Sequence, residues 1–391
     1  MPDAALTALI DRVRAARTDR TPLHIHGGRT KAFYGEPVPD HGPAQALDIR
    51  GLCGISSYEP SELVVTVRAG TPLAELEAAL AEAGQCLPFE PPRYRAADAP
   101  GGVVSGAVGG MVGGTVGGMV SAGLAGPARA AVGGVRDYVL GATLLNGRAE
   151  VLSFGGQVIK NVAGYDVSRL LVGALGTLGV VCEVSLKVLP LPVASATLRL
   201  EIDEAAALKQ LNVWGGQPLP INASAWWNGR LVLRLCGAAA AVQSALQSMA
   251  ARLGGQVMDP ALAAVFWTGL RDHSDEFFTR AGTAVQAGAT LWRISVPQTA
   301  TPMALAGEHL VEWGGAQRWV ITTTAAGAVR EAAVRAGGHA TIFRCGAAAA
   351  AAAGVSRLAP LSAPLLRIHQ QMKAEFDPDR VFNPGRLYAG L

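Results

Sequence analysis

Apolar residues recur along the first 190 residues with periods that predict a mixture of helices and strands. Residues 3–17 are predicted to form a helix with one apolar face, made by Leu6, Leu9, Ile10 and Val13. Short apolar runs predict strands at residues 23–26, 46–49, 63–67, 139–145 and 180–189. The alternation of the two kinds of element indicates an α+β fold for this part of the chain.

A second helix is predicted from its start and stop signals. Thr71-Pro72 is typical of a helix start, with Thr71 as the N-cap and Pro72 in the first turn. The helix should run through Ala83, because Gly84 is a favoured residue just beyond a helix end.

The amino-acid composition of the sequence changes near residue 190. Pro190 and Pro192 interrupt the last apolar run, and all seven Trp residues of the chain come after them. This shift predicts a domain boundary, with one domain over 1–190 and a smaller one over 191–360. An alanine run at 347–353 is compositional and predicts no chemistry.

Charge and cysteine content exclude several classes of protein. Of the 391 residues, half are apolar and only 16% are charged, which excludes a disordered chain. The 33 basic and 30 acidic residues are balanced and show no basic cluster, so a nucleic-acid binder is not expected. Five scattered cysteines without a C-x-x-C pair predict no disulfide framework, zinc site or iron–sulfur cluster. The N-terminal segment has no apolar core of a signal peptide, which favours the cytosol.

Glycine is enriched, at 48 residues, and is concentrated between Gly101 and Gly126. The series Gly102, Gly106, Gly110, Gly114 and Gly118 has the spacing of small residues in packed membrane helices. However, eleven of these 26 residues are glycine, and each costs a helix roughly 1 kcal/mol relative to alanine. A membrane span is therefore the weaker interpretation.

Three glycine loops suggest a different role. Gly27-Gly28 follows a predicted strand, and adjacent glycines let backbone amides converge on one anion. A plain tight turn is the alternative, since neither G-x-G-x-x-G nor a P-loop motif is present. Further glycine loops at 115–127 and 160–180 favour the anion interpretation. Together they predict a large, flat cofactor that bears phosphate.

These segments resemble the FAD-binding domain of the vanillyl-alcohol oxidase (PCMH-type) flavoproteins, and their order is most similar to that of the FAD-binding E subunits of bacterial glycolate oxidases. The matching pieces are HGGRTKAFYG (26–35), SSYEPSELVVTVRAGTPLAELEAAL (56–80), GGMVSAGLAGPAR (117–129), VRDYVLG (135–141), FGGQVIKNVAGYDVSRLLVGALGTLGV (154–180) and FDPDRVFNPGRL (376–387). Residues 191–360 carry little beyond a loose likeness in WGGAQRW (313–319).

The resemblance implies FAD bound noncovalently, with named residues around it. The loop Gly27, Gly28, Arg29, Thr30 and Lys31 would hold the pyrophosphate through backbone amides. A second loop would run beside the pyrophosphate and the flavin edge, with Gly117, Gly118, Met119, Ser121, Ala122 and Gly123. The remaining flavin and adenine contacts would come from Gly164, Tyr165, Asp166, Val180 and Val181. Asn383 would return the C-terminal segment, 361–391, to the FAD domain. His26 borders the first loop and leaves covalent attachment open.

Two departures from the family matter. The related catalytic D subunits carry a His-rich motif in the cap domain, whereas His273, His309 and His339 are isolated here. Arg234, Arg293 and Arg344 are then the remaining weak candidates for binding a carboxylate. Gly101–Val116 also appears as tandem four-residue units, so the flavin loop aligns either at Asp98–Gly102 or at Thr115–Gly118. The second alignment is preferred because it continues into Ser121-Ala122-Gly123.

The resemblance implies a flavoprotein oxidoreductase subunit that takes part in oxidising glycolate to glyoxylate. Its partners in a hetero-oligomer would be a catalytic flavin subunit of the D type and an iron–sulfur subunit of the F type. The complex would lie in the cytoplasm or at the inner face of the cytoplasmic membrane. Two alternatives are a self-sufficient FAD-dependent 2-hydroxy-acid dehydrogenase and a structural subunit that has lost FAD.

Overall fold

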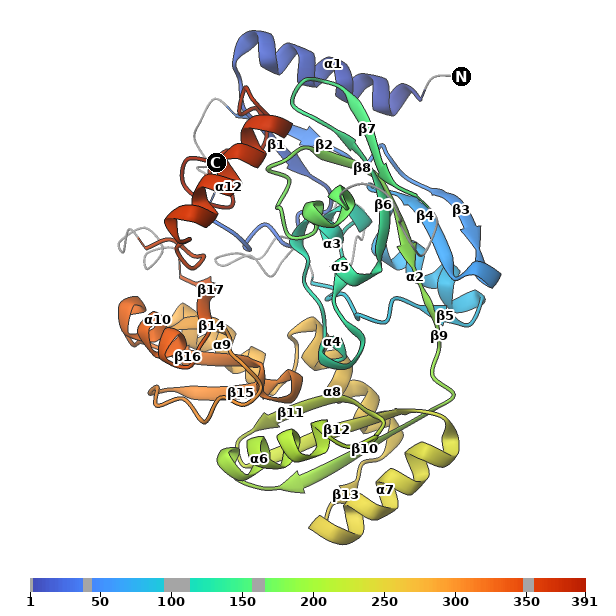
Figure 1. The fold of residues 1–391 in the computed structure, drawn as a ribbon, viewed down its shortest axis with the longest axis vertical. Helices are drawn as coiled ribbons and strands as arrows, with labels where there is room; N and C mark the ends of the chain where they lie inside the picture. Colours follow the sequence, from blue (N-terminus) through green and yellow to red (C-terminus); the bar gives the residue numbers. More distant parts are fainter. Residues whose placement is uncertain (1–2, 38–43, 95–112, 157–165, 347–354) are drawn as a thin grey trace.

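The computed structural model describes residues 3–37, 44–94, 113–156, 166–346 and 355–391. Figure 1 shows two bodies stacked along the long axis. The upper body contains the N-terminal elements and the C-terminal helix, and the lower body contains the elements between them. Within the described ranges, no helix has both the length and the apolar composition to cross a membrane. Most of the Gly101–Val116 tract, residues 101–112, lies outside those ranges.

The upper body is built around a five-stranded antiparallel sheet with the order β3-β4-β8-β6-β7. A parallel pair, β1-β2, adds a second small sheet, and its strand β1 also meets the C-terminal segment at Leu23 and Phe382. The elements are α1 (Ala4–Asp19), β1 (Leu23–His26), β2 (Gln45–Asp48), β3 (Ile55–Glu59), η1 (Pro60–Glu62), β4 (Val64–Arg68), α2 (Leu73–Glu82), β5 (Gln85–Cys86), α3 (Val116–Ala122), α4 (Arg129–Val132), α5 (Val135–Tyr138), β6 (Val139–Leu145), β7 (Val151–Gly155), η3 (Val167–Leu171), β8 (Val180–Lys187), β9 (Leu189–Pro190) and α12 (Ala363–Phe376).

The lower body is built around an eight-stranded antiparallel sheet with the order β13-β10-β12-β11-β15-β16-β14-β17. Its elements are β10 (Ala194–Glu201), α6 (Glu204–Gly215), β11 (Ile221–Trp227), β12 (Arg230–Gly237), α7 (Ala239–Leu253), β13 (Gln256–Val257), α8 (Pro260–Asp272), α9 (Glu276–Gln286), β14 (Thr290–Ser295), β15 (Glu308–Glu312), η4 (Trp313–Gly315), β16 (Gln317–Thr322), α10 (Ala326–Arg335) and β17 (His339–Cys345).

Alternating side chains of this large sheet enter different cores. One face packs against α6, α7 and α10. The other face packs against α8 and α9 and against Tyr94 and Leu124 of the upper body. The two bodies therefore share one apolar core, and a site between them is held from both sides.

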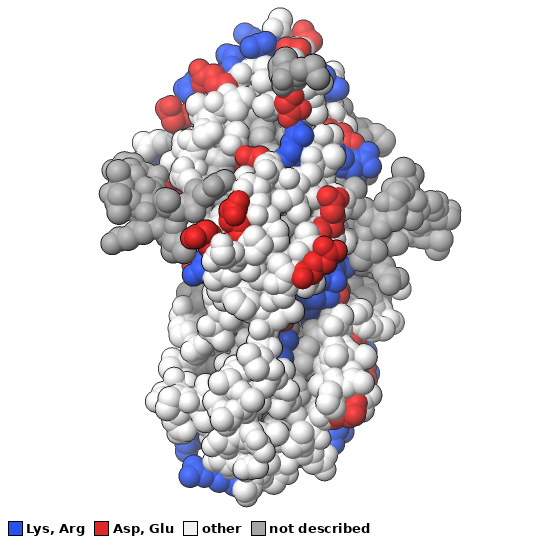
Figure 2. All heavy atoms as spheres, turned by 90° about the vertical axis from the view of Figure 1, so that its right-hand side faces the viewer, with Lys and Arg blue, Asp and Glu red and all other residues white. Residues whose placement is uncertain are grey.

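The surface differs between the two bodies. Figure 2 shows that charged side chains gather over the upper part of one side, while the lower part is largely uncharged. Helix α7 illustrates the uncharged part, because most of its exposed positions are Ala, Gln or Ser.

The start of α2 corrects one prediction. Pro72, not Thr71, is the N-cap, and no side chain caps this end of the helix. The Thr71 hydroxyl instead accepts a hydrogen bond from the Gly54 amide at 2.9 Å and donates to the Gly54 carbonyl at 3.2 Å. Thr71 is completely buried, so its hydroxyl takes the partner that the tertiary fold provides. The end of the helix matches its prediction, with Ala83 as the C-cap and Gly84 at a φ of +66°.

The C-terminal segment is fastened to the upper body by a buried ion pair. Lys373 on α12 lies 2.6 Å from Asp377, and their side chains are 3% and 0% exposed. The same ammonium group donates to the carbonyls of Thr177 and Phe382, at 2.7 and 2.8 Å. Helix α12 and the loop before β8 are thus joined at one cation.

Candidate functional site

The first two glycine loops lie against each other, although they are about 85 residues apart in sequence. A Cβ atom at Gly27 would lie 2.4 Å from Thr115 Oγ1, and one at Gly114 would lie 2.6 Å from Thr30 Oγ1. Only residues without a side chain allow this approach. Lys31 adds a direct tie, because its Nζ donates to the Gly113 carbonyl at 3.1 Å. The two loops therefore form one continuous surface.

The first loop presents unused backbone donors. The amides of Gly28, Arg29, Thr30 and Lys31 form no hydrogen bond with the backbone of any described residue. Arg29 has a φ of +55°, which turns the chain at this point. A run of such amides in a turn is suited to binding an oxyanion. Thr30 is buried, so its amide would lack a hydrogen-bond partner unless a ligand supplied one. The loop fits the pyrophosphate of FAD on this criterion.

Lys31 places a basic group beside this loop. Its Nζ also lies 5.7 Å from the centroid of the Tyr94 ring. Burial lowers the pKa of Lys31 to about 8, and the carboxylates of Asp272 and Glu77 oppose that shift. An anion bound nearby would favour the charged form of Lys31.

Helix α3 supplies the second loop. Thr115 is its N-cap and accepts a hydrogen bond from the Gly118 amide at 3.1 Å. Gly117 is pressed against Ala69, since a Cβ atom there would lie 2.8 Å from the Ala69 Cβ. The side chains of Met119 and Ala122 are buried in the protein. Along this stretch a ligand could therefore meet backbone groups and the partly exposed residues Gly118, Ser121 and Gly123.

The end of α3 organises the loop before β8. The carbonyls of Val120 and Ser121 accept hydrogen bonds from the amides of Gly173 and Leu175, at 3.0 and 2.9 Å. Gly123 ends the helix with a φ of +62°. Val120 and Ser121 thus position the neighbouring loop through their backbone.

The predicted third group of residues is spread out. Gly164 and Tyr165 lie outside the described residues. Asp166 precedes η3, where its carboxylate accepts a hydrogen bond from Ser168 Oγ at 2.6 Å and pairs with Arg169 at 2.8 Å. Val180 and Val181 begin β8, and their side chains are buried in the sheet. A cofactor could meet these two valines only through their backbone.

Asn383 uses both ends of its side chain within the protein. Its Oδ1 accepts from the Ile25 amide at 2.9 Å, and its Nδ2 donates to the Leu175 carbonyl at 2.7 Å. The residue has a φ of +41°, a conformation that Asn tolerates better than most residues. Asn383 therefore positions β1, and with it the loop that follows, against the segment before β8.

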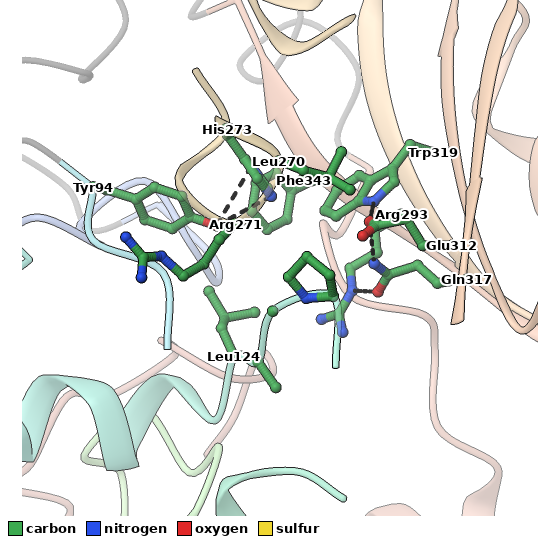
Figure 3. A pocket seen from close by; sticks show the side chains of 13 residues that line it. Tyr94, Leu124, Leu270, Arg271, His273, Arg293, Glu312, Gln317, Trp319 and Phe343 are labelled. Atoms are coloured by element: carbon green, nitrogen blue, oxygen red, sulfur yellow. Dashed lines mark hydrogen bonds between the residues drawn. The ribbon is translucent and has the colours of Figure 1, made fainter. Parts of the chain in front are cut away.

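An enclosed pocket lies where the lower body meets the loop after α3 (Figure 3). It encloses about 10 Å³, room for about one water molecule. The upper body contributes Tyr94 and the segment from Leu124 to Pro127, and the lower body contributes residues of α8, β14, β15, β16 and β17. Trp313 closes the contact by donating from Nε1 to the Gly126 carbonyl at 3.0 Å.

One side of the pocket is a chain of hydrogen bonds around Glu312. Its carboxyl group accepts from Trp319 Nε1 at 2.6 Å and from Gln317 Nε2 at 3.0 Å. Gln317 in turn accepts from Arg293 Nε at 2.7 Å. Burial raises the pKa of Glu312 to about 7, although both donors favour its ionised form. The group can therefore gain or lose a proton near neutral pH.

The other side of the pocket is aromatic. His273 stacks on Phe278 with ring centroids 3.6 Å apart, and both of its ring nitrogens lie 3.4 Å from the Tyr94 hydroxyl. Burial, together with Arg344 and Arg293, lowers the pKa of His273 well below its ordinary value. His273 is therefore a buried, neutral histidine beside the Tyr94 hydroxyl.

The three candidate arginines lie in different places. Arg293 lines the pocket, and the Arg344 guanidinium lies 3.8 Å from the centroid of the Phe33 ring. Arg234 is elsewhere, in an ion pair with Glu90 at 2.8 Å. Glu312, Gln317 and Trp319 were not predicted as site residues from the sequence. A signal was present, because these residues flank or lie within the WGGAQRW segment and face one another across the β15–β16 pair.

Comparisons with known proteins agree with this arrangement. The family "FAD binding domain" matches residues 6–114. The glycolate oxidase subunit GlcE of Escherichia coli (strain K12) is 46% identical over 384 residues, which cover 98% of this chain and 97% of that protein. The glycolate oxidase subunit GlcD of Bacillus subtilis (strain 168) is 44% identical over 66 residues, 17% of this chain and 14% of that protein. A solved structure of alkyldihydroxyacetonephosphate synthase superposes with a TM-score of 0.62 at 12% identity, covering 96% of this chain and 74% of that one.

The fold and the paired glycine loops define a flavoprotein with a PCMH-type FAD-binding domain, as the resemblance predicted. The matches identify this chain as an FAD-dependent oxidoreductase subunit. Within that class, the chain belongs to the family of the glycolate oxidase subunit GlcE.

Proposed function

We propose that this chain is the FAD-binding subunit of a multi-subunit glycolate oxidase and takes part in oxidising glycolate to glyoxylate. The observation that carries the proposal is the set of amides from Gly28 to Lys31, which bond to no backbone group of the described residues and lie against the start of α3. Full-length similarity to a protein named for glycolate oxidation supports the substrate. FAD, when bound, would accept and pass on electrons.

The protein's own residues would bind and orient the cofactor noncovalently. Amides of Gly28 to Lys31 would hold the pyrophosphate, and the Gly117–Gly123 stretch would border the flavin. Gly164, Tyr165, Asp166, Val180 and Val181 remain proposed contacts for the rest of the cofactor. Asn383 acts through β1, since its amide is already occupied by protein partners. We propose residues 1–190 as the FAD domain, 191–360 as the cap domain and 361–391 as the returning segment.

A D-type flavin subunit and an iron–sulfur F-type subunit are the proposed partners, with the complex at the inner face of the cytoplasmic membrane. Similarity over 66 residues to a subunit named GlcD supports relatedness to the first partner. The second partner would supply the iron–sulfur ligands, because all five cysteines of this chain are free and scattered.

A self-sufficient hydroxy-acid dehydrogenase is the second candidate, favoured by one observation. Glu312 and Arg293 face the same pocket, so a proton acceptor and a carboxylate-binding cation are present there. The small volume of the pocket, about 10 Å³, opposes this candidate. Anaerobic mixing of the FAD-loaded chain with glycolate and with D-lactate separates the two. We expect no rapid bleaching of the flavin band, and bleaching by either compound would favour the self-sufficient enzyme.

Replacement of Gly28 by leucine tests the cofactor loop. The added side chain would occupy the space from which the amides reach the pyrophosphate, so the variant should purify folded but without flavin absorbance. Gly282→Leu is a suitable control, because nothing lies within 4 Å of a Cβ atom there and, as at Gly28, the backbone φ is not positive. Full flavin occupancy in Gly28→Leu would show that this loop does not hold the pyrophosphate.

A further inference from the structure

The turn that follows the cofactor loop is held by the C-terminal segment. Arg386 Nη1 donates to the Glu36 carbonyl. Its Nη2 donates to the carbonyls of Ala32 and Tyr34. The backbone of Arg386 adds a further bond, because its carbonyl accepts from the Glu36 amide at 2.9 Å. One residue near the end of the chain therefore fixes three peptide groups that lie 350 to 354 positions earlier.

Ala32 and Tyr34 connect these contacts to the amides proposed for the pyrophosphate. The Ala32 amide donates to the Arg29 carbonyl at 3.1 Å. The Tyr34 amide donates to the Lys31 carbonyl at 3.0 Å. A peptide group is planar, so the Arg29 carbonyl and the Thr30 amide turn together. Holding Ala32 and Tyr34 therefore also holds the direction in which the Thr30 amide points.

The turn packs tightly against Arg386. Gly35 has a φ of +90°, and a Cβ atom there would lie 2.9 Å from the Arg386 carbonyl oxygen and 2.5 Å from Leu175 Cδ1. Only glycine allows this approach. Arg357 donates to the intervening carbonyls, those of Phe33 and Gly35. All five carbonyls from residue 32 to residue 36 are thus held by two arginine side chains.

Arg386 keeps its charge although burial disfavours it. Burial lowers the pKa of Arg386 to about 10, the charge of Arg357 adds to that shift, and Glu36 opposes it. The guanidinium is therefore protonated near neutral pH. Its N–H donors form a rigid planar fork that can reach several carbonyls at once, whereas a lysine ammonium has the same charge without the fork.

We propose that Arg386 is a positioning residue for the cofactor and couples FAD binding to the docking of the C-terminal segment. The inference rests on the proposed role of Gly28–Lys31 in binding the pyrophosphate. Arg386 orders those amides through Ala32 and Tyr34, and FAD on the amides in turn holds the C-terminal segment in place. The coupling acts in both directions by thermodynamic necessity.

Titration of the protein with FAD, after removal of bound flavin, tests the role of Arg386 when it is followed by flavin fluorescence. Arg386→Met should bind FAD about tenfold more weakly, within the roughly 5- to 150-fold range typical of coupled sites. Arg386→Lys should lose a similar factor, because it keeps the charge but lacks the fork. Wild-type affinity in either variant would overturn the proposal, and in Arg386→Lys alone it would mean that only the charge matters.

Arg17→Met is the matched control. Arg17 also fastens the C-terminal segment, through Asp379 at 2.8 Å, and donates to the Arg148 carbonyl at 3.1 Å. Among the described residues, it donates to none of the carbonyls from residue 32 to residue 36. The control should bind FAD like the wild type. Equal weakening in Arg17→Met and Arg386→Met would contradict a specific role for Arg386.

Gly28→Leu in the same titration separates this inference from the proposed function. Loss of FAD in Gly28→Leu together with full affinity in Arg386→Met would overturn only the role of Arg386. Full affinity in Gly28→Leu would overturn the loop assignment on which both proposals rest.

Hydrogen exchange of the wild-type protein tests the coupling without any variant. The Glu36 amide donates to the Arg386 carbonyl, so its exchange should slow about tenfold when FAD binds. The Gly147 amide donates to the Phe376 carbonyl at 2.8 Å and reports on a different contact of the C-terminal segment. Its exchange should change less. Equal slowing at the two amides would mean that FAD stabilises the whole domain alike, which would contradict the proposed coupling.

Discussion

Two buried carboxyl groups, one in each body of the molecule, are surrounded by different kinds of partner. Asp377 in the FAD domain has a cation at 2.6 Å, and accepts from the amides of Val381 and Phe382 at 2.9 and 2.8 Å. Glu312 in the cap has only the neutral donors of Trp319 and Gln317. The first group has a charge partner that fastens chain segments together. Among the described residues, the second accepts hydrogen bonds only from neutral groups, with the Arg293 charge acting on it less directly, and its own charge depends on pH.

This difference distinguishes Asp377, a carboxyl group with a structural role, from Glu312, a carboxyl group that could transfer a proton. Burial lowers the pKa of Lys373, and the Asp377 charge opposes that shift, so each partner makes the other's charge tolerable. Burial raises the pKa of Glu312 to about 7. A carboxyl group that titrates near neutral pH beside a pocket is a candidate for proton transfer.

The largest effect should come from breaking the ion pair of the FAD domain. Asp377→Ala leaves the Lys373 ammonium buried without its counter-charge, and it also leaves two amides without an acceptor. We expect the free energy of unfolding to fall by about 3–5 kcal/mol, the usual cost of removing one partner of a buried pair. Urea unfolding followed by circular dichroism measures this loss.

Asp379→Ala is the control for that prediction. Asp379 pairs with Arg17 at 2.8 Å, but the two side chains are 47% and 37% exposed. Its loss should cost about 1 kcal/mol or less. Similar losses in the two variants would mean that the Lys373–Asp377 pair does not fasten the C-terminal segment.

A helix or strand could be predicted from the sequence where the residues that determine it lie within the segment itself. The strands at Leu23–His26 and Val139–Leu145 and the helix over Leu73–Glu82 were predicted because apolar periodicity and turn residues lie within each segment. The glycine loops could also be predicted from the sequence, because close backbone approach requires glycine at particular positions. Strands β3 and β7 were missed, because Ser residues and exposed positions interrupt their apolar pattern.

Tertiary partners explain the remaining failures. Thr71 has the pattern of an N-cap, but its hydroxyl bonds to Gly54, which lies 17 residues earlier. Glu312 looks like an exposed residue of a strand until β16 places Trp319 and Gln317 beside it. Its burial also depends on α8, α9 and the loop after α3, which no local pattern connects. The WGGAQRW segment therefore marks the region, but the burial that makes Glu312 a candidate for proton transfer could not be predicted from the sequence.

Glu312→Gln sharpens the comparison by removing the titration while keeping the shape. The folded pKa of Glu312, about 7, lies above the ordinary value of 4.5, so the folded state holds its proton more tightly than the unfolded state. The stability from this group is complete below pH 4.5 and is lost as the pH rises through 7. At about 1.4 kcal/mol per pKa unit, the loss is about 3 kcal/mol.

The measurement is the difference between wild-type and Glu312→Gln unfolding free energies at several pH values. Subtraction cancels the part of the Asp275 contribution that is independent of Glu312. Burial raises the pKa of Asp275 to about 6, and its charge also raises the pKa of Glu312. The variant should gain relative to the wild type as the pH rises from 5 to 8. A constant difference across that range would mean that Glu312 is ionised throughout.

The smallest effect concerns the contact that joins the two regions. The Trp313 indole of the cap lies between two guanidinium groups, with Arg129 of the FAD domain 4.7 Å and Arg293 of the cap 5.3 Å from its ring centroid. A double-mutant cycle with Arg129→Met and Trp313→Phe should give a coupling free energy of about 0.5–1 kcal/mol, typical of a partly exposed cation–π contact.

The matched control is the same cycle within the cap, with Arg293→Met in place of Arg129→Met. We expect a smaller coupling there, since the distance is longer and Arg293 is also held by Gln317. A coupling of zero for Arg129 would show that the indole joins the domains only through its hydrogen bond to Gly126.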